Sequence, residues 1–174
     1  HDGDGQVIPR LAERWDYDPD TLTYTFYLAQ GVTWHDGQPF TAEDVKFTYE
    51  AIMDPDNGSE NAPNYEDVTD ITVIDDHTVS FTLSAVNTAF LEYMTMAILP
   101  QHLLEGEDMQ TSDFFRAPVG TGPYKLESWD VGQSITKRPM EISLLPQRSR
   151  WVDRMVKFCC PFTNNLENCL FTAG

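Results

Sequence analysis

Residues 21–28 restrict the fold most, because apolar and hydroxyl-bearing side chains alternate along them. One parity holds Leu22, Tyr24, Phe26 and Leu28, while the other holds three threonines and Tyr27. Alternation with a period of two is typical of a strand that has one buried face. A turn at Asp18-Pro19-Asp20 joins this strand to an extended segment at 15–17. The sequence therefore predicts a β-hairpin near its start.

An amphipathic helix is expected at residues 42–53. Thr41 and Asp44 have the spacing of a capping box, with Asp44 in the position that glutamate usually occupies. Val45, Tyr49 and Ile52 then recur at i, i+4 and i+7, which gives one apolar stripe. The stripe ends before Asp54-Pro55, where proline stops a helix.

The remaining segments mix further hairpins with short helices, which indicates a mixed α/β (α+β) fold without internal repeats. The expected elements are a hairpin formed by 71–74 and 79–83, a helix at 87–97, a turn of helix at 100–104, and a hairpin formed by 124–129 and 134–136. A polar surface loop is expected at 54–64, and a rigid turn at 118–123.

The composition is strongly acidic. Among 174 residues there are 28 acidic and 11 basic side chains, a formal net charge of -17. Such a charge repels a phosphate backbone, so nucleic acid is excluded as a partner. No apolar run approaches the roughly 18 residues that a membrane-spanning helix needs. These properties predict a soluble acidic protein.

The charge changes sign between residues 136 and 137. Residues 1–136 carry a net charge of -20, whereas residues 137–174 carry +3 and contain all three cysteines, Cys159, Cys160 and Cys169. These cysteines match no zinc spacing and are expected to be free thiols. An abrupt shift of this kind marks a boundary.

The turn at Trp34-His35-Asp36-Gly37 is the most plausible place for chemistry. A histidine beside a carboxylate could act in a hydrolase, but sequence neighbours point in opposite directions along an extended chain. We therefore expect a tight turn whose polar side chains bond the local backbone. Gly120-Thr121-Gly122 is expected to be structural, because Pro123 lacks an N–H donor for phosphate. No catalytic centre, metal site or cofactor is predicted.

Asn64 and Tyr65 are the candidate substrate-binding residues. They follow the polar loop, and a tyrosine there can reach into a cleft with its ring and its hydroxyl. The structural alternative for Tyr65 is a partly buried packing residue.

Several motifs together resemble the extracellular solute-binding proteins of family 5, the dipeptide-, oligopeptide- and nickel-binding receptors of bacterial ABC importers. The resemblance runs from about Gln6 to Thr136 and is carried, in order, by LAERW, VTWHDGQPF, TAEDV, IDDHTVSFTL, ILPQHLL and VGTGPYKLESW.

This resemblance implies part of one lobe of a two-lobed clamshell of the type II periplasmic-binding-protein kind. Residues 1–97 correspond to a small subdomain with hairpins and the helix at 42–53, and residues 98–136 begin the ligand-facing subdomain. Residues 137–174 form a divergent tail, for which we propose a shift of reading frame near 137–151 and again after about Val156. Tyr65 falls where some peptide receptors place a ligand-contacting aromatic residue.

The resemblance also implies a function. It predicts a non-catalytic, monomeric receptor, periplasmic or extracellular and associated with the cell surface, that captures di- or oligopeptides for ABC permease subunits. The chain opens at His1 without a signal peptide, and a preceding portion is expected. The alternatives left open are a nickel- or haem-binding member of the same family and a hydrolase that uses His35 with nearby carboxylates.

Overall fold

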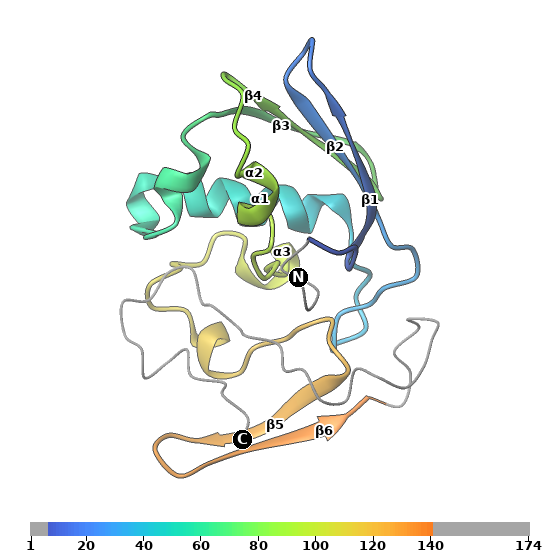
Figure 1. The fold of residues 1–174 in the computed structure, drawn as a ribbon. Coiled ribbons are helices and arrows are strands. Elements are labelled where there is room, and N and C mark those ends of the chain that lie inside the picture. The colour runs from blue at the N-terminus through green and yellow to red at the C-terminus, as the bar shows by residue number, and fades with distance from the viewer. Residues whose placement is uncertain (1–6, 141–174) are drawn as a thin grey trace.

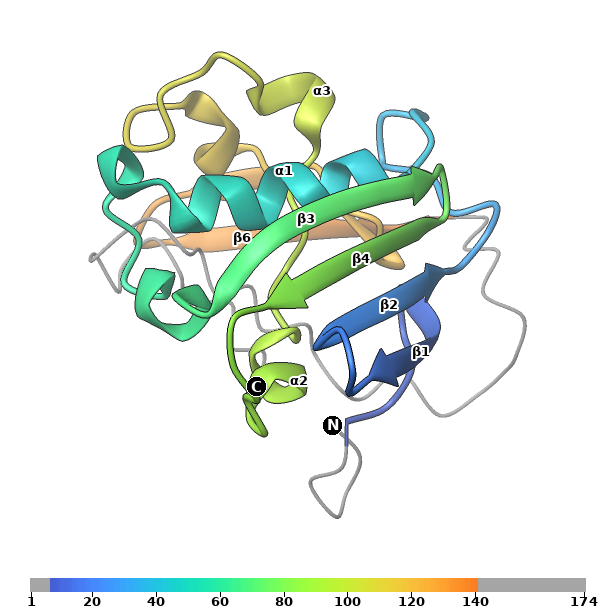
Figure 2. The same ribbon diagram turned by 90° about the horizontal axis from the view of Figure 1, so that it is seen from above.

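The two predicted hairpins combine into one antiparallel sheet in the computed structural model, which describes residues 7–140 (Figures 1 and 2). The first hairpin consists of β1 (Ala12–Asp18) and β2 (Thr23–Leu28), and the second of β3 (Val68–Asp75) and β4 (Thr78–Leu83). The strand order is β1-β2-β4-β3, so β2 pairs with β4 across a long stretch of intervening chain. Both hairpins are confirmed, while their order comes from the tertiary structure.

The alternation of residues 21–28 determines which face of the sheet is buried. Phe26 and Leu28 are almost fully buried, and Phe26 lies opposite buried Val79 of β4. On the other face Thr25 lies opposite Asp16 of β1 and Ser80 of β4. A one-residue slip would exchange these faces, so the pattern also fixes the register.

The helix α1 (Ala42–Met53) covers the apolar face of the sheet, as Figure 2 shows from above. Thr41 and Asp44 form the predicted capping box, in which Asp44 Oδ2 accepts the Thr41 N–H at 3.0 Å. Val45, Tyr49 and Ile52 are buried, and the Tyr49 ring packs edge-on against Phe81 of β4. Burial of each such apolar side chain contributes about 1.5–3 kcal/mol.

The helix expected at 87–97 is much shorter in the structure, where α2 comprises only Phe90–Tyr93. Two carbonyls that a longer helix would use bind hydroxyl groups instead. The Tyr93 carbonyl accepts the Tyr65 hydroxyl at 2.6 Å, and the Glu92 carbonyl accepts the Thr95 hydroxyl at 2.8 Å. Phe90 is fully buried and anchors this single turn in the core.

The loop expected at 54–64 contains two short 3₁₀ helices, η1 (Pro55–Asn57) and η2 (Ala62–Tyr65). The predicted turn of helix at 100–104 is α3 (Gln101–Leu104), and a further 3₁₀ helix, η3 (Asp113–Arg116), follows it. In Figure 1, α3 lies on the side of α1 away from the sheet.

A second, two-stranded sheet lies at the opposite end of the described residues from the four-stranded sheet (Figure 1). It consists of β5 (Tyr124–Asp130) and β6 (Ser134–Pro139), joined by a turn in which Gly132 adopts a positive φ of 77°. This hairpin is confirmed, and β6 runs three residues past its predicted end, into the segment assigned to the tail. From residue 141 onward, the tail and its proposed frame shifts lie outside the described residues.

Candidate functional site

Residues 34–38 fold into a tight turn between β2 and α1. The turn is closed by hydrogen bonds from the Trp34 N–H to the Gln38 carbonyl and from the Gly37 N–H to the Trp34 carbonyl, at 2.8 and 2.9 Å. Gly37 has φ of 95°, a conformation that favours glycine. The Asp36 Oδ1 accepts the Gln38 N–H at 3.1 Å. The expected bonding of a polar side chain to the local backbone is therefore present.

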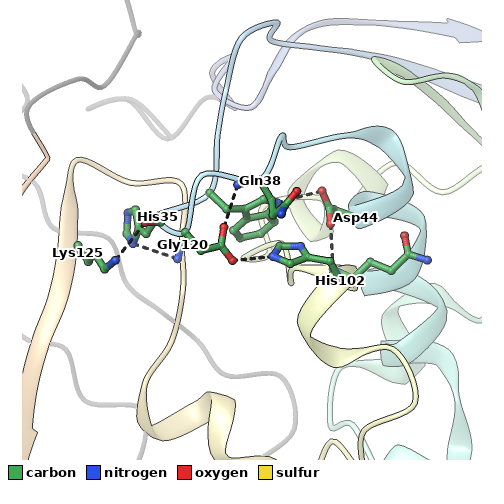
Figure 3. Close-up of polar contacts among 9 residues, drawn as sticks. His35, Gln38, Asp44, His102, Gly120 and Lys125 are labelled. Carbon is green, nitrogen blue, oxygen red and sulfur yellow. Dashed lines mark hydrogen bonds and ion pairs between the residues drawn. The ribbon is translucent and has the colours of Figure 1, made fainter.

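His35 attaches this turn to residues 120–122. Its Nδ1 accepts the Gly120 N–H at 3.2 Å, so its Nε2 carries the proton and donates to the Gly122 carbonyl at 2.7 Å. The His35 N–H also donates to the Gly120 carbonyl at 2.9 Å, and the Lys125 Nζ donates to the His35 carbonyl at 3.2 Å (Figure 3). Both ring nitrogens are therefore used in holding the backbone.

Asp36 binds a different partner from its neighbour. Its Oδ2 lies 2.7 Å from Nε2 of His102 on α3, and the two side chains are about 30% exposed. Partial burial tends to raise the pKa of Asp36, but hydrogen bonds from His102 and from the Gln38 N–H outweigh this effect. The pKa of Asp36 therefore lies below its ordinary value. The His35–Asp36 dyad required by the hydrolase alternative does not form.

Asp44 is the centre of the buried polar contacts. Only 4% exposed, it accepts the indole N–H of Trp34 at 3.1 Å, the Thr41 N–H at 3.0 Å and the Gln101 N–H at 2.9 Å. These donors come from the turn, from the start of α1 and from the start of α3. A buried carboxylate needs such donors in place of water.

Thr48, one turn farther along α1, makes a second connection to the segment before α3. Its hydroxyl donates to the Asp44 carbonyl at 2.7 Å and accepts the Leu99 N–H at 2.8 Å. We call these connections the clasp. It consists of the turn 34–38, Asp44 and Thr48 on one side, and residues 99–102 and 120–125 on the other. The clasp attaches the second half of the described chain to α1 and the turn.

Sequence reasoning identified some members of the clasp but not their role. The capping box placed Asp44 at the helix start, and the turn at 34–38 was expected. Their partners are Gln101, Leu99 and His102. Each of these lies more than 50 positions along the chain from the residue that it binds, so no local pattern indicates the contact.

The two candidate substrate-binding residues lie on η2, away from the clasp. Tyr65 is only 1% exposed, its hydroxyl binds the Tyr93 carbonyl, and its ring packs edge-on against Tyr49 and Tyr93. Burial raises the pKa of Tyr65, and the nearby Tyr93 adds to this effect. The neighbouring Asn64 is half-buried. A role for either residue in binding solute stays a prediction.

Two further properties concern the described residues alone. Between residues 7 and 140, His, Cys, Asp and Glu side chains form no group of three placed to hold a metal ion. No helix in this part of the chain is long and apolar enough to cross a membrane.

The part of the chain that contains the clasp and both sheets matches a known family. Residues 6–139 match the family model described as bacterial extracellular solute-binding proteins, family 5 Middle. The chain belongs to this family. Solute-binding proteins of family 5 are not enzymes.

Three relatives illustrate the similarity. The chain is 35% identical over 147 residues to di/tripeptide-binding protein 1 of Pseudomonas aeruginosa, a match that covers 70% of this chain and 27% of that protein. NikZ from Campylobacter jejuni, solved with Ni(L-His), is 40% identical with a TM-score of 0.72, over 75% of this chain and 27% of NikZ. AppA from Bacillus subtilis, solved with a nonapeptide, is 31% identical with a TM-score of 0.69, again over 75% and 27%. The chain thus spans about a quarter of the length of these family 5 proteins.

Proposed function

We propose that the chain forms part of one lobe of a substrate-binding receptor for an ABC importer, and that the receptor captures di- or oligopeptides. The match to family 5 over residues 6–139 carries this proposal. The peptide assignment is supported by two relatives, one named a di/tripeptide-binding protein and one solved with a nonapeptide. The receptor would act outside the cytoplasmic membrane, in the periplasm or at the cell surface, as a monomer that delivers its solute to membrane permease subunits.

In this proposal the described residues provide a rigid support for half of a binding cleft. Solute would be enclosed between two lobes, with its backbone polar groups hydrogen-bonded to protein or ordered water. The clasp keeps the β5–β6 hairpin fixed relative to α1 and the first sheet. Closure of the lobes would then move them as units, and solute would shift the population toward the closed form.

Asn64 and Tyr65 are the residues that we propose to serve solute binding in this lobe. Because the Tyr65 hydroxyl is already bound within the core, we assign it the role of positioning η2, and we assign Asn64 the direct polar contact. We call the complete two-lobed receptor, of which we propose this chain to be a part, the longer receptor. In it, Asn64→Ala should weaken peptide binding without lowering the melting temperature of the peptide-free protein. Tyr65→Phe should instead lower the melting temperature of the peptide-free protein, because it removes the hydrogen bond to the Tyr93 carbonyl. The reverse pattern would contradict these roles.

Isothermal titration calorimetry with trialanine tests the main proposal. The 174-residue chain should show negligible binding, because it provides only one side of the cleft, whereas the longer receptor should bind. Micromolar affinity of the short chain would overturn the assignment to part of one lobe. A longer receptor that binds no di- or oligopeptide from a mixed library would overturn the assignment to peptides.

A nickel complex is the second candidate solute, because NikZ, at 40% identity, was solved with Ni(L-His). Titration of the longer receptor with Ni(II) and L-histidine, and separately with haem, distinguishes these alternatives from a peptide. Saturable binding of Ni(L-His) without peptide binding would favour nickel uptake.

A further inference from the structure

The surface of the described chain carries far more negative than positive charge. Residues 7–140 contain 23 Asp and Glu residues but only seven Lys and Arg residues. Even if each basic side chain neutralised one carboxylate, 16 carboxylates would have no Lys or Arg partner. The excess is therefore a property of the whole described surface.

Almost all of these carboxylates face solvent. Of the 23 acidic residues, 21 are exposed as whole residues, and the exceptions are the buried Asp44 and the half-buried Asp67. Among the 21, the Asp36 side chain is about 30% exposed, because it contacts His102. The ion pairs Arg14–Asp16 and Lys46–Glu50 do little to offset the charge. Both side chains of the first pair are well exposed, and the charged atoms of the second pair are 3.8 Å apart. Exposed pairs of this kind contribute at most about 1 kcal/mol each.

The acidic side chains also lie close to one another along the fold. Asp16 and Asp18 project from the same face of β1, roughly 7 Å apart along the strand. Their cross-strand partners Thr25 and Thr23 are neutral. Asp75 and Asp76 share the turn between β3 and β4, and Glu105, Glu107 and Asp108 follow α3 within four residues.

Folding brings these charges together. A chain of 174 residues contracts from a radius of gyration of roughly 44 Å to roughly 16 Å, so mutual repulsion of the carboxylates opposes the compact state. The Debye length is about 10 Å at 0.1 M salt, longer than the spacing along β1, and about 3 Å at 1 M, shorter than it. Molar salt therefore removes a repulsion that dilute buffer leaves in place.

We propose that the folded state of this chain depends on salt, and that the protein works in saline surroundings of roughly molar concentration. The hydrophobic core under the first sheet provides the attraction, and screening by cations lets it prevail over the surface repulsion. This inference concerns the stability of the fold and is independent of the solute that the receptor binds.

Thermal unfolding of the 174-residue chain tests the proposal, with tryptophan fluorescence and far-ultraviolet circular dichroism as signals. Between about 0.1 M and about 2 M NaCl, the melting temperature should rise by about 10 °C or more. KCl should act equally, whereas sucrose, which is excluded from protein surfaces but does not screen charge, should not reproduce the rise. A chain that melts at the same temperature in all salts overturns the proposal, and so does one that shows no cooperative unfolding even at 3 M.

A charge-altering variant separates screening from general effects of salt. Glu13, Glu60, Glu107 and Glu127 are exposed and lie on different parts of the surface. Replacing all four with lysine changes the net charge by eight units, and should raise the melting temperature at 0.1 M NaCl and flatten its rise with salt. The matched control replaces the same four residues with aspartate, which keeps the charge and should keep the slope. Equal slopes in the two variants would contradict the role of charge repulsion.

Discussion

A buried carboxylate such as Asp44 is stable only where hydrogen-bond donors replace the water that it has lost. Its three donors come from Trp34, Thr41 and Gln101, so one side chain holds together the turn, the start of α1 and the start of α3. Its contribution to the fold therefore exceeds that of an ordinary helix cap.

Asp44→Asn should lower the free energy of unfolding by about 2–4 kcal/mol. Asparagine has a single acceptor oxygen, and its amide group would face an N–H donor. Urea denaturation in 2 M NaCl measures the effect. The matched control is Glu43→Gln, which removes an exposed charge from the same helical turn and should cost less than about 1 kcal/mol. If both substitutions have equal effects, the role of Asp44 in the clasp is wrong.

The contact between Asp36 and His102 should make part of the stability depend on pH. The pKa of Asp36 is lowered in the folded chain, so its carboxylate stabilises the fold above the ordinary pKa of 3.8. This stabilisation is lost as the pH falls through the folded-state pKa. A double-mutant cycle of Asp36→Asn and His102→Ala should show coupling at pH 6 that shrinks below about pH 4. Coupling that does not change over this range would contradict the assignment.

At the scale of elements, the two sheets differ in how well they are supported. The four-stranded sheet is covered by α1. Within residues 7–140, β5 and β6 pair only with each other and expose most of their side chains. An isolated two-stranded hairpin is only marginally stable in water. The hairpin therefore depends on the contacts of Lys125 and of residues 120–122 with His35.

Hydrogen exchange should reveal this difference. Corrected for sequence, the hydrogen-bonded amides of β5 and β6 should exchange at least about 100-fold faster than those of β2 and β4. His35→Ala removes the ring contacts with Gly120 and Gly122, and should speed exchange in the hairpin further while leaving β2 and β4 unchanged. Equal protection in the two sheets would show that the hairpin has support beyond the clasp.

At the scale of the whole molecule, the clasp connects two segments that the family resemblance predicts to be separate subdomains. The boundary near residue 97, inferred from resemblance, lies just before Leu99 and Gln101, the residues that bind Thr48 and Asp44. The segment just after the predicted boundary is therefore hydrogen-bonded to helix α1, which lies before it. This arrangement suits a receptor lobe that moves as one body.

Local patterns predicted most of the elements because they depend on neighbouring residues. The alternation at 21–28 determined the buried face of β2, and the capping box with its apolar stripe placed α1 at 42–53. The length predicted for the helix at 87–97 was wrong for a nonlocal reason. The hydroxyl of distant Tyr65 binds the Tyr93 carbonyl, which a longer helix would need.

The sequence by itself determined the presence of each hairpin, the position of the main helix and the excess of surface charge. These features depend on periodicity, turn residues and charge, which can be seen in short stretches of the chain. Only the tertiary structure decided that β2 pairs with β4, that His35 and Asp36 bind separate partners, and that Asp44 joins three segments. Those choices depend on which distant groups can exclude water together and satisfy one another's hydrogen bonds, and no short stretch of sequence contains both partners.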